Sequence, residues 1–251
     1  MTPLFTIITV TYNAASTLPY TLESIRRQTC RLFEHIIQDG ASTDGTYDIA
    51  RKCGIQETRV ISRPDHGLYD AMNMALAEAQ GDYVIFLNAG DRFHTDDTLQ
   101  KIADTIMDNN YPGIVYGQTD IVDITGKRLA DRHLLAPEKL TLQSFAEGMV
   151  VCHQSFVALR RITPQFNCRY RYSADYDWCI QCLQHSHYNI YIDGTLTDYL
   201  SEGMTTSNRY SSLKERFFIM CRYYGKWPTI KRHLRFIPRF LKRRQIEKTF
   251  K

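Results

Sequence analysis

Short apolar segments with the character of β-strands alternate with helical segments through the first 110 residues of the chain. The expected strands are Leu4–Val10, Phe33–Gln38, Arg59–Arg63 and Asp82–Leu87. The expected helices, with apolar residues at helical spacing, are Ser16–Gln28, Thr43–Cys53, Leu68–Ala79 and Asp96–Asp108. Strands that alternate with helices are typical of a mainly parallel sheet with right-handed crossovers. The sequence therefore predicts an α/β fold, with a Rossmann-like, mainly parallel central sheet flanked by helices.

The second half of the chain is less regular. Its expected elements are a hairpin made of Ile114–Val122 and Lys127–Leu134, strands at Phe156–Leu159 and Tyr188–Ile192, and a helix from Asp175 to about His185. From Ser211 onward the pattern is helical and basic. With 251 residues, 43% of them hydrophobic, the chain is long enough for one α/β domain and a modest appendage.

Seven cysteines at irregular spacing indicate reduced thiols and a cytosolic setting. Cys179 and Cys182 form a C-x-x-C pair, but no second pair at zinc spacing accompanies them and both fall within an expected helix. We therefore interpret them as packing residues rather than as a redox or zinc site. No amino-terminal signal segment is visible, and no apolar run approaches the ~18 to 20 residues that span a bilayer. The sequence thus predicts a protein that is soluble or peripheral to a membrane.

Asparagine and aspartate follow the first four expected strands. Asn13 follows the first strand, Asp39 the second, Asp65 the third, and the run Asn88–Asp91 the fourth. In open α/β sheets ligands bind beyond the carboxyl ends of the strands. An anionic ligand would need a cation to enter so acidic an edge. A dinucleotide-binding fold is disfavoured, because no G-x-G-x-x-G motif follows the first strand.

Five motifs occur in a fixed order along the chain. They are Thr9–Asn13, Gln38–Thr46, Asp65–Asn73, Phe86–Asp91 and Ala174–Asp177. The series resembles the bacterial family 2 glycosyltransferases of the GT-A fold, and is most similar to those that build capsular, exopolysaccharide or O-antigen chains. These enzymes are inverting and use nucleotide-sugar donors. The resemblance covers about residues 4–205, so we expect a GT-A domain over 1–208, with a nucleotide-binding half at about 1–110 and an acceptor half at about 111–208.

The resemblance implies a donor site along the strand ends. Asp39 would accept a hydrogen bond from the imide N–H of uracil or thymine, with an Asx turn before Gly40 as the alternative role. The nucleoside would lie against Thr11, Tyr12 and Asn13, although Tyr12 could equally be a core aromatic. Further donor contacts would come from Asp65, Asn88, Ala89 and Gly90.

The resemblance also implies a metal ligand and a general base. Asp91 would hold Mg²⁺ or Mn²⁺, although Asn88 replaces the first acid of the commoner D-x-D pattern, which removes one negative charge from the site. Asp175 would take the proton of the acceptor hydroxyl, with a helix amino-terminal charge as its alternative role. Asp177 fits the helix-terminal role better. His153 and Gln154 are expected on the acceptor side.

The carboxyl-terminal segment 209–251 is strongly basic. It carries 14 Lys or Arg against two acids, a net charge of 14 − 2 = +12, so that residues 1–208 carry 4 − 12 = −8. Aromatic and aliphatic residues such as Phe217, Trp227 and Phe236 lie between these charges. An amphipathic helix of this composition is typical of contact with an anionic membrane surface. The alternative is that the apolar face packs on the domain; no recognition motif supports nucleic-acid binding.

Together these features predict a metal-dependent, inverting glycosyltransferase that is cytoplasmic and peripheral on the inner face of the membrane. It would transfer a sugar from a UDP- or dTDP-sugar to a polyprenyl-linked saccharide. A sugar nucleotidyltransferase is a weaker alternative, because Thr9–Leu18 contains no Gly, Lys or Arg for a phosphate loop. A non-catalytic sugar-nucleotide-binding or scaffold module is a third reading, suggested by Asn88.

Overall fold

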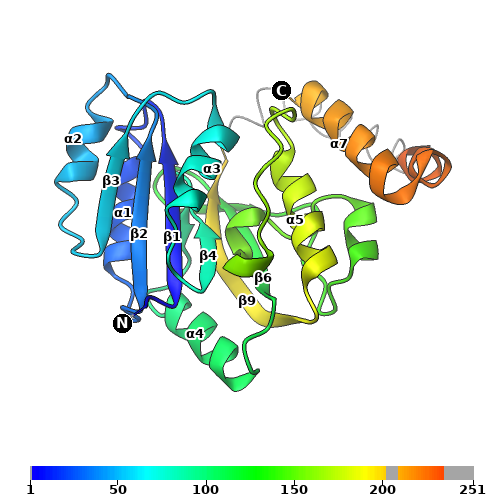
Figure 1. Cartoon of the computed structure of the whole chain (residues 1–251), viewed down its shortest axis with the longest axis horizontal. Helices are drawn as coiled ribbons and strands as arrows, with labels where there is room; N and C mark the ends of the chain where they lie inside the picture. The colour runs from blue at the N-terminus through cyan, green and yellow to red at the C-terminus, as the bar shows by residue number, and fades with distance from the viewer. Residues whose placement is uncertain (1, 202–208, 235–251) are drawn as a thin grey trace.

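A computed structural model describes residues 2–201 and 209–234, and its centre is one nine-stranded sheet (Figure 1). The strands are β1 (Phe5–Thr11), β2 (Phe33–Asp39), β3 (Thr58–Ser62), β4 (Tyr83–Phe86), β5 (Arg92–Phe93), β6 (Ile114–Val122), β7 (Arg128–Asp131), β8 (Phe156–Leu159) and β9 (Asn189–Leu200). Their order is β3-β2-β1-β4-β8-β6-β9-β5, and β7 pairs with β6. The sheet runs without a break through the expected nucleotide-binding and acceptor halves.

The sheet is mixed and mostly parallel. Strands β1 to β4 are mutually parallel, as are β6 and β9, whereas β8 is antiparallel to both of its neighbours, β4 and β6. The start of β8 therefore lies at the same edge of the sheet as the carboxyl ends of β1 to β4. Residues that precede β8 reach the edge where an α/β sheet binds its ligands.

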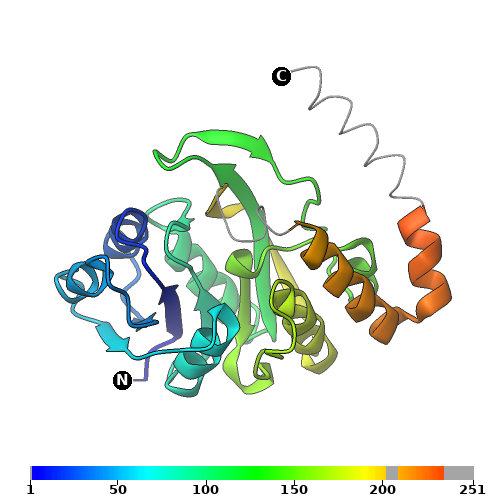
Figure 2. The same cartoon turned by 90° about the horizontal axis from the view of Figure 1, so that it is seen from above.

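Helices cover both faces of the sheet (Figures 1 and 2). They are α1 (Leu18–Arg26), α2 (Thr46–Arg51), α3 (Leu68–Ala77), α4 (Thr98–Asp108), α5 (Ala174–His185) and α7 (Arg209–Tyr224). One buried cluster joins α3 and α5 to the sheet and includes Phe86, Tyr116 and Trp178. The other lies under α1 and α4 and includes Leu18 and Leu99. Cys179 and Cys182 are free thiols buried in the first cluster, which confirms their interpretation as packing residues.

The expected α/β fold is confirmed, with three differences in detail. The helix expected from Ser16 begins at Leu18, with Thr17 as its N-cap. The last strand continues beyond Ile192 to Leu200, because a register irregularity near Gly194, whose φ is +122°, lets β9 stay paired with β6. The two-residue strand β5 follows Asp91 directly and had no sequence signal of its own.

Two helical stretches follow the domain. Helix α7 buries Ser212, Ile219 and Met220 against it, so the alternative in which the apolar face packs on the domain holds for this helix. Gly225, at a φ of +84°, ends α7 and starts a second helical stretch at residues 226–234. The rest of the basic tail, residues 235–251, lies outside the described residues. Within residues 2–201 and 209–234, no helix is long and apolar enough to cross a bilayer.

Candidate donor and acceptor site

Asp39 is a fully buried carboxylate at the end of β2. Its Oδ1 accepts hydrogen bonds from the hydroxyls of Thr11 (3.1 Å) and Ser42 (2.5 Å), and its Oδ2 accepts from the backbone N–H of Ser42 (3.1 Å) and the hydroxyl of Ser62 (2.6 Å). The bond from the backbone N–H of Ser42 comes from the third residue after Asp39, whereas an Asx turn would use the N–H of the second, Ala41. These four bonds match the number of lone pairs on a carboxylate, so a ligand that binds Asp39 must replace one of them.

The three other residues expected at the nucleoside site have different environments. Tyr12 is not a core aromatic, because 69% of its surface is exposed. Asn13 instead fixes the loop after β2: its N–H donates to Ser42 Oγ at 2.9 Å, and its side-chain oxygen accepts from the N–H of Thr43 at 3.0 Å. Thr11 supports Asp39 from within the sheet.

Asp65 lies against the same loop. A Cβ atom at Gly40 would be 2.5 Å from Asp65 Oδ2 and 3.3 Å from the ring of Tyr12. The side chains of Asp65 and Tyr12 therefore approach each other over Gly40, which has no side chain to separate them. Asp65 Oδ1 accepts a hydrogen bond from the N–H of Gly67 at 2.8 Å. Asp39, Tyr12 and Asp65 thus surround a single position at the edge of the sheet.

The loop Asn88–Asp91 is anchored by the hydroxyl of Thr21 on α1. This hydroxyl accepts from the N–H of Gly90 at 2.8 Å and donates to the carbonyl of Asp91 at 2.8 Å. Gly90 has a φ of +106°, and a Cβ there would meet Leu200 at 2.7 Å, so the position needs glycine. Ala89 bridges to Asp91 within the loop. The backbone of the loop is therefore fixed before any ligand binds.

Asp91 is buried, and among residues 2–201 and 209–234 its carboxylate forms no salt bridge. Its Oδ2 accepts from Gln154 Nε2 at 2.7 Å and its Oδ1 accepts from the N–H of Leu200 at 3.1 Å. Burial raises the pKa of Asp91 to about 6, although these hydrogen bonds and the charge of His153 oppose the shift. The side-chain oxygens of Asn88 and Gln154 are buried and accept no hydrogen bond from any described residue.

Asp175 lies in the first turn of α5 and is joined to the Asn88 loop through His153. His153 Nδ1 is 3.3 Å from Asp175 Oδ2, and His153 Nε2 is 3.3 Å from Asn88 Nδ2. The Tyr69 hydroxyl donates to Asp175 Oδ1 at 3.0 Å. Burial alone raises the pKa of Asp175, but the hydrogen bond and charge of His153, with help from Arg216 and Tyr69, bring it below its ordinary value.

His153 and Gln154 therefore occupy the centre of this arrangement. The two adjacent residues precede β8, which inserts beside β4, and they contact the side chains of Asp175, Asn88 and Asp91. The sequence does not identify Tyr69 as a partner of Asp175, although Tyr69 lies within the motif Asp65–Asn73. For Thr21 the sequence gives no signal other than its place on the buried face of α1.

Helix α7 holds the segment that leads into α5. The carboxylate of Glu215 accepts hydrogen bonds from the N–H groups of Arg171 (2.9 Å) and Tyr172 (2.8 Å), and the hydroxyls of Ser173 and Ser212 are 3.0 Å apart. Asp177 lies in the first turn of α5, the position expected of a helix-terminal charge. It is fully buried and accepts from the Tyr223 hydroxyl at 2.8 Å and from Gln181 at 2.8 Å.

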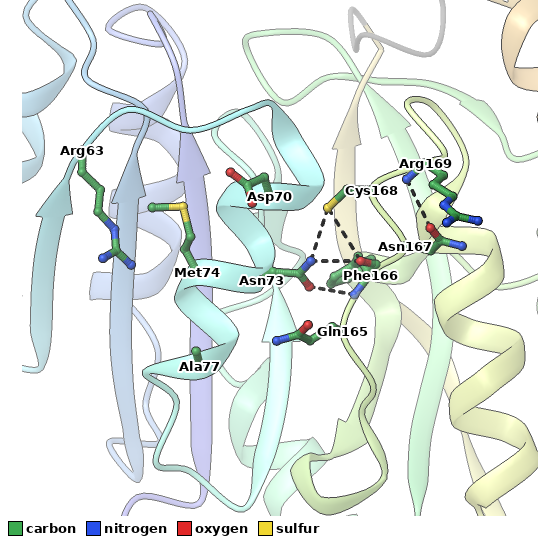
Figure 3. Close-up of a pocket in the computed structure, with 10 residues that line it drawn as sticks. All are labelled: Arg63, Asp70, Asn73, Met74, Ala77, Gln165, Phe166, Asn167, Cys168 and Arg169. Carbon is green, nitrogen blue, oxygen red and sulfur yellow. Dashed lines mark hydrogen bonds between the residues drawn. The ribbon is translucent and has the colours of Figure 1, made fainter.

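A groove of about 830 Å³ runs beside α3, next to the loop that precedes α5 (Figure 3). Asn73 fixes this loop, because its side chain exchanges two hydrogen bonds with the backbone of Phe166, at 2.7 and 2.9 Å. Phe166 in turn stacks on Tyr69, with ring centroids 5.6 Å apart. The polar residues lining the groove include Arg63, Asp70 and Arg169. Phe166 therefore separates the groove from Tyr69, whose hydroxyl donates to Asp175.

A separate His/Asp/Asp group lies among β5, β6 and β9. Ligand atoms of His94, Asp120 and Asp198 are all within 4.8 Å of one another. Both carboxylates already have side-chain partners: His94 Nδ1 is 2.7 Å from Asp198, and Arg128 Nε donates to Asp120 at 3.0 Å. In the described part of the chain the carboxylate of Asp91 forms no salt bridge, and the amide oxygens of Asn88 and Gln154 near it accept no hydrogen bond, so Asp91 is the better candidate for a metal ligand.

The fold, with its carboxylates at one edge of the sheet, is that of the GT-A class of glycosyltransferases. The chain belongs to glycosyl transferase family 2, whose model matches residues 6–162. It is 36% identical over 187 residues to a PGL/p-HBAD biosynthesis glycosyltransferase of Mycobacterium bovis, covering 72% of this chain and 70% of the relative. It is 28% identical over 222 residues to a putative teichuronic acid biosynthesis glycosyltransferase, TuaG, of Bacillus subtilis, covering 86% and 87%.

Solved structures support the same fold. S. aureus TarS in complex with UDP-GlcNAc superposes with a TM-score of 0.71 at 17% sequence identity, covering 92% of this chain and 73% of TarS. A mannosyltransferase of Pyrobaculum calidifontis in complex with GDP-Man and Mn²⁺ superposes with a TM-score of 0.61 at 19% identity, covering 88% and 65%. The expected GT-A fold and the expected glycosyltransferase class are thereby confirmed.

Proposed function

We propose that this glycosyltransferase is inverting and metal-assisted, and that it moves a sugar from a UDP- or dTDP-sugar to a lipid-linked saccharide in the synthesis of a cell-surface polysaccharide. The observation that carries the proposal is the pair His153 and Gln154. These neighbours contact the side chains of Asp175 and Asp91, so the candidate base and the candidate metal ligand belong to one connected site.

The nucleoside would bind over Gly40, between Tyr12 and Asp65. Its imide N–H would donate to Asp39 in place of the Ser42 hydroxyl, because a serine hydroxyl can rotate to another acceptor whereas the bonds from Thr11 and Ser62 come from within the sheet. The complex of TarS with UDP-GlcNAc supports a uridine nucleotide as donor.

The residues around Asp91 fit a hard divalent cation. Mg²⁺ and Mn²⁺ prefer oxygen ligands. Asp91 offers a buried carboxylate beside the side-chain oxygens of Asn88 and Gln154, which accept no hydrogen bond from the described residues. These three residues would hold the ion, which would stabilise the charge that develops on the leaving diphosphate. The complex of the Pyrobaculum mannosyltransferase with Mn²⁺ supports the use of a metal.

Asp175 would act as the general base. Its side chain retains 15% exposure, and its lowered pKa keeps it ionised at neutral pH. The acceptor oxygen would attack the anomeric carbon as the bond from that carbon to the diphosphate oxygen breaks. The electron pair would leave with the diphosphate, and the hydroxyl proton would pass to Asp175. Attack opposite the leaving group inverts the anomeric centre.

The acceptor would approach from the side of α5. The groove beside α3 has the volume of a ligand pocket and is lined by both polar and apolar residues, which suits a saccharide. The names of the mycobacterial relative and of TuaG support a product at the cell surface. We propose that the enzyme is cytoplasmic and associates with the inner face of the membrane through its basic carboxyl-terminal segment. We also propose that the glycosyltransferase domain consists of a nucleotide-binding half and an acceptor half that meet at about residue 110.

A calorimetric titration tests this function. UDP, dTDP, GDP and CDP are each titrated with and without Mn²⁺, and transfer is then measured with the nucleotide sugars that correspond to the tighter ligands. Metal-dependent binding of UDP or dTDP, followed by transfer, would support the proposal. Binding without transfer across a broad panel of acceptors would favour the scaffold function instead, and absence of binding would refute the donor site.

A further inference from the structure

The helical stretch 226–234 exposes a stripe of three large apolar side chains. Trp227, Ile230 and Leu234 are spaced i, i+3 and i+7, which places them on one side of the helix. Their exposed fractions are 82%, 36% and 61%. We call these three residues the apolar stripe. An isolated exposed apolar residue is ordinary, but an aligned set on a single helix face indicates a contact surface.

The opposite side of this helix packs inward, so the stripe has a fixed direction. Thr229 is fully buried, and the rings of His233 and Phe217 are 5.1 Å apart. Arg232 Nε is 3.5 Å from a carboxylate oxygen of Glu147 on the domain. The stripe therefore points away from the residues that attach this helix to α7 and to the domain.

Positively charged residues accompany the stripe in the sequence. Lys226 and Lys231 form no ion pair with any residue in the described parts of the chain, and Lys231 follows Ile230 directly. The sequence beyond residue 234 adds seven Lys or Arg and one Glu, a net charge of 7 − 1 = +6. Two copies that joined their stripes would bring these like charges together, which is unfavourable. An anionic lipid surface instead matches both the apolar residues and the charges.

We propose that the apolar stripe inserts into the interface of an anionic bilayer, with Trp227 at the level of the headgroups and Lys226 and Lys231 at the lipid phosphates. This inference rests on, and deepens, the proposed membrane association, because it names the surface and the lipid class. It does not require turnover, so it stands or fails independently of the donor and the acceptor.

The two tryptophans of the chain make the test direct. Trp178 is fully buried and Trp227 is exposed, so quenching of fluorescence by acrylamide reports on Trp227. The full chain is mixed with vesicles of phosphatidylcholine alone, or with vesicles of about one third phosphatidylglycerol. We expect a blue shift and a several-fold loss of quenching with the anionic vesicles only.

A matched pair of variants isolates the stripe. Ile230→Gln with Leu234→Gln should weaken binding to anionic vesicles about tenfold or more, whereas Leu129→Gln with Leu135→Gln, two exposed leucines elsewhere, should leave it unchanged. Unchanged emission of Trp178 would show that each variant is folded.

Several results would overturn the proposal. Sedimentation with vesicles while Trp227 stays fully quenchable would assign binding to the tail charges alone. If Trp227 is protected from acrylamide in the absence of lipid, the chain itself covers the stripe. If that protection grows with protein concentration, a second copy covers it. Equal binding by the stripe variant, or no binding to either vesicle, would also refute it.

Discussion

His153 Nδ1 lies 3.3 Å from Asp175 Oδ2, and the same ring reaches Asn88 through its other nitrogen. One imidazole therefore connects the helix that carries the candidate base with the loop that carries the candidate metal ligand. The two contacts use different ring nitrogens, so the ring can hold both partners at the same time.

Replacing His153 should change the pH dependence of transfer. Burial favours the protonated form of Asp175, and His153 is the main group that opposes it. In His153→Gln the pKa of Asp175 should rise, so the fall in kcat on acidification should begin at a higher pH than in the parent. The measurement is kcat against pH at saturating donor and acceptor. His94→Gln serves as the control, and an acid limb that stays in place in His153→Gln would contradict the assignment.

Asp175→Asn should abolish transfer while preserving donor binding. General-base catalysis contributes roughly 10²- to 10⁴-fold, so kcat should fall by about that factor. The affinity for UDP with Mn²⁺, measured by calorimetry, should change little because the side chain of Asp175 contacts Tyr69 and His153 and not the residues proposed to bind the nucleoside. Transfer at the parental rate would remove Asp175 from the role of base.

Asp39 and Ser42 should have opposite effects on donor affinity. Asp39→Asn loses a charged acceptor, and a hydrogen bond to a charged group is worth about 1.5 to 3 kcal/mol, so UDP should bind roughly 10- to 100-fold more weakly. Ser42→Ala frees one lone pair of Asp39 without removing the charge, so UDP should bind as well as before or better. Calorimetry on both variants decides, and a large loss in Ser42→Ala would refute the proposed exchange.

In the metal-free protein, the ionisation of Asp91 should lower the free energy of unfolding as the pH rises. Its pKa is raised to about 6 in the fold, above the value of about 3.9 in an unfolded chain. The folded state then binds more protons between about pH 4 and 6, so unfolding becomes easier across that range and stays so above it. Asp91→Asn should therefore raise the free energy of unfolding at pH 7.5 by about 1 to 3 kcal/mol, and by little at pH 4.

Urea unfolding at both pH values, with and without Mn²⁺, tests Asp91. The parent should gain stability from Mn²⁺ by mass action, whereas the Asp91→Asn variant should not. The amide of Gln154 can rotate to present its donor-free oxygen to the side-chain amide that this substitution introduces, so the variant should fold. Equal stabilisation of both proteins by Mn²⁺ would move the metal to another site, such as the group around Asp198.

Glu215 on α7 should affect catalysis from a distance. Its carboxylate accepts from two backbone N–H groups just before α5, so Glu215→Ala should loosen the start of the helix that carries Asp175. Small displacements of a catalytic group are costly, and kcat should fall by about 10- to 100-fold with little change in UDP affinity. Lys214→Ala, at the exposed neighbouring position, is the control. Parental kcat in Glu215→Ala would show that α7 has no positioning role.

Local patterns predicted most of the fold but only part of the site. The alternation of strands and helices and the polar residues after β1 to β4 depend on short stretches, which is why Asp39 and Asp91 were found at the expected edge. The central place of His153 and Gln154 depends on β8 entering between β4 and β6, a pairing that no local pattern encodes. The contacts of Thr21 with the Asp91 loop, and of Glu215 with the start of α5, span 70 and 44 residues. Such long-range contacts leave no periodic trace in a sequence.

The place of β8 in the sheet has a consequence for the synthesis of the chain. While only the first half has left the ribosome, β1 to β4 can pair, but the outer edge of β4 stays open until β8 is made about 70 residues later. The edge belongs to the fully buried, apolar run Tyr83–Phe86, which is a template for unwanted strand pairing. A polypeptide released before Phe156 would therefore lack half of its site and would also be prone to aggregate. Completion of the chain protects this edge by the same step that brings His153 and Gln154 to Asp91.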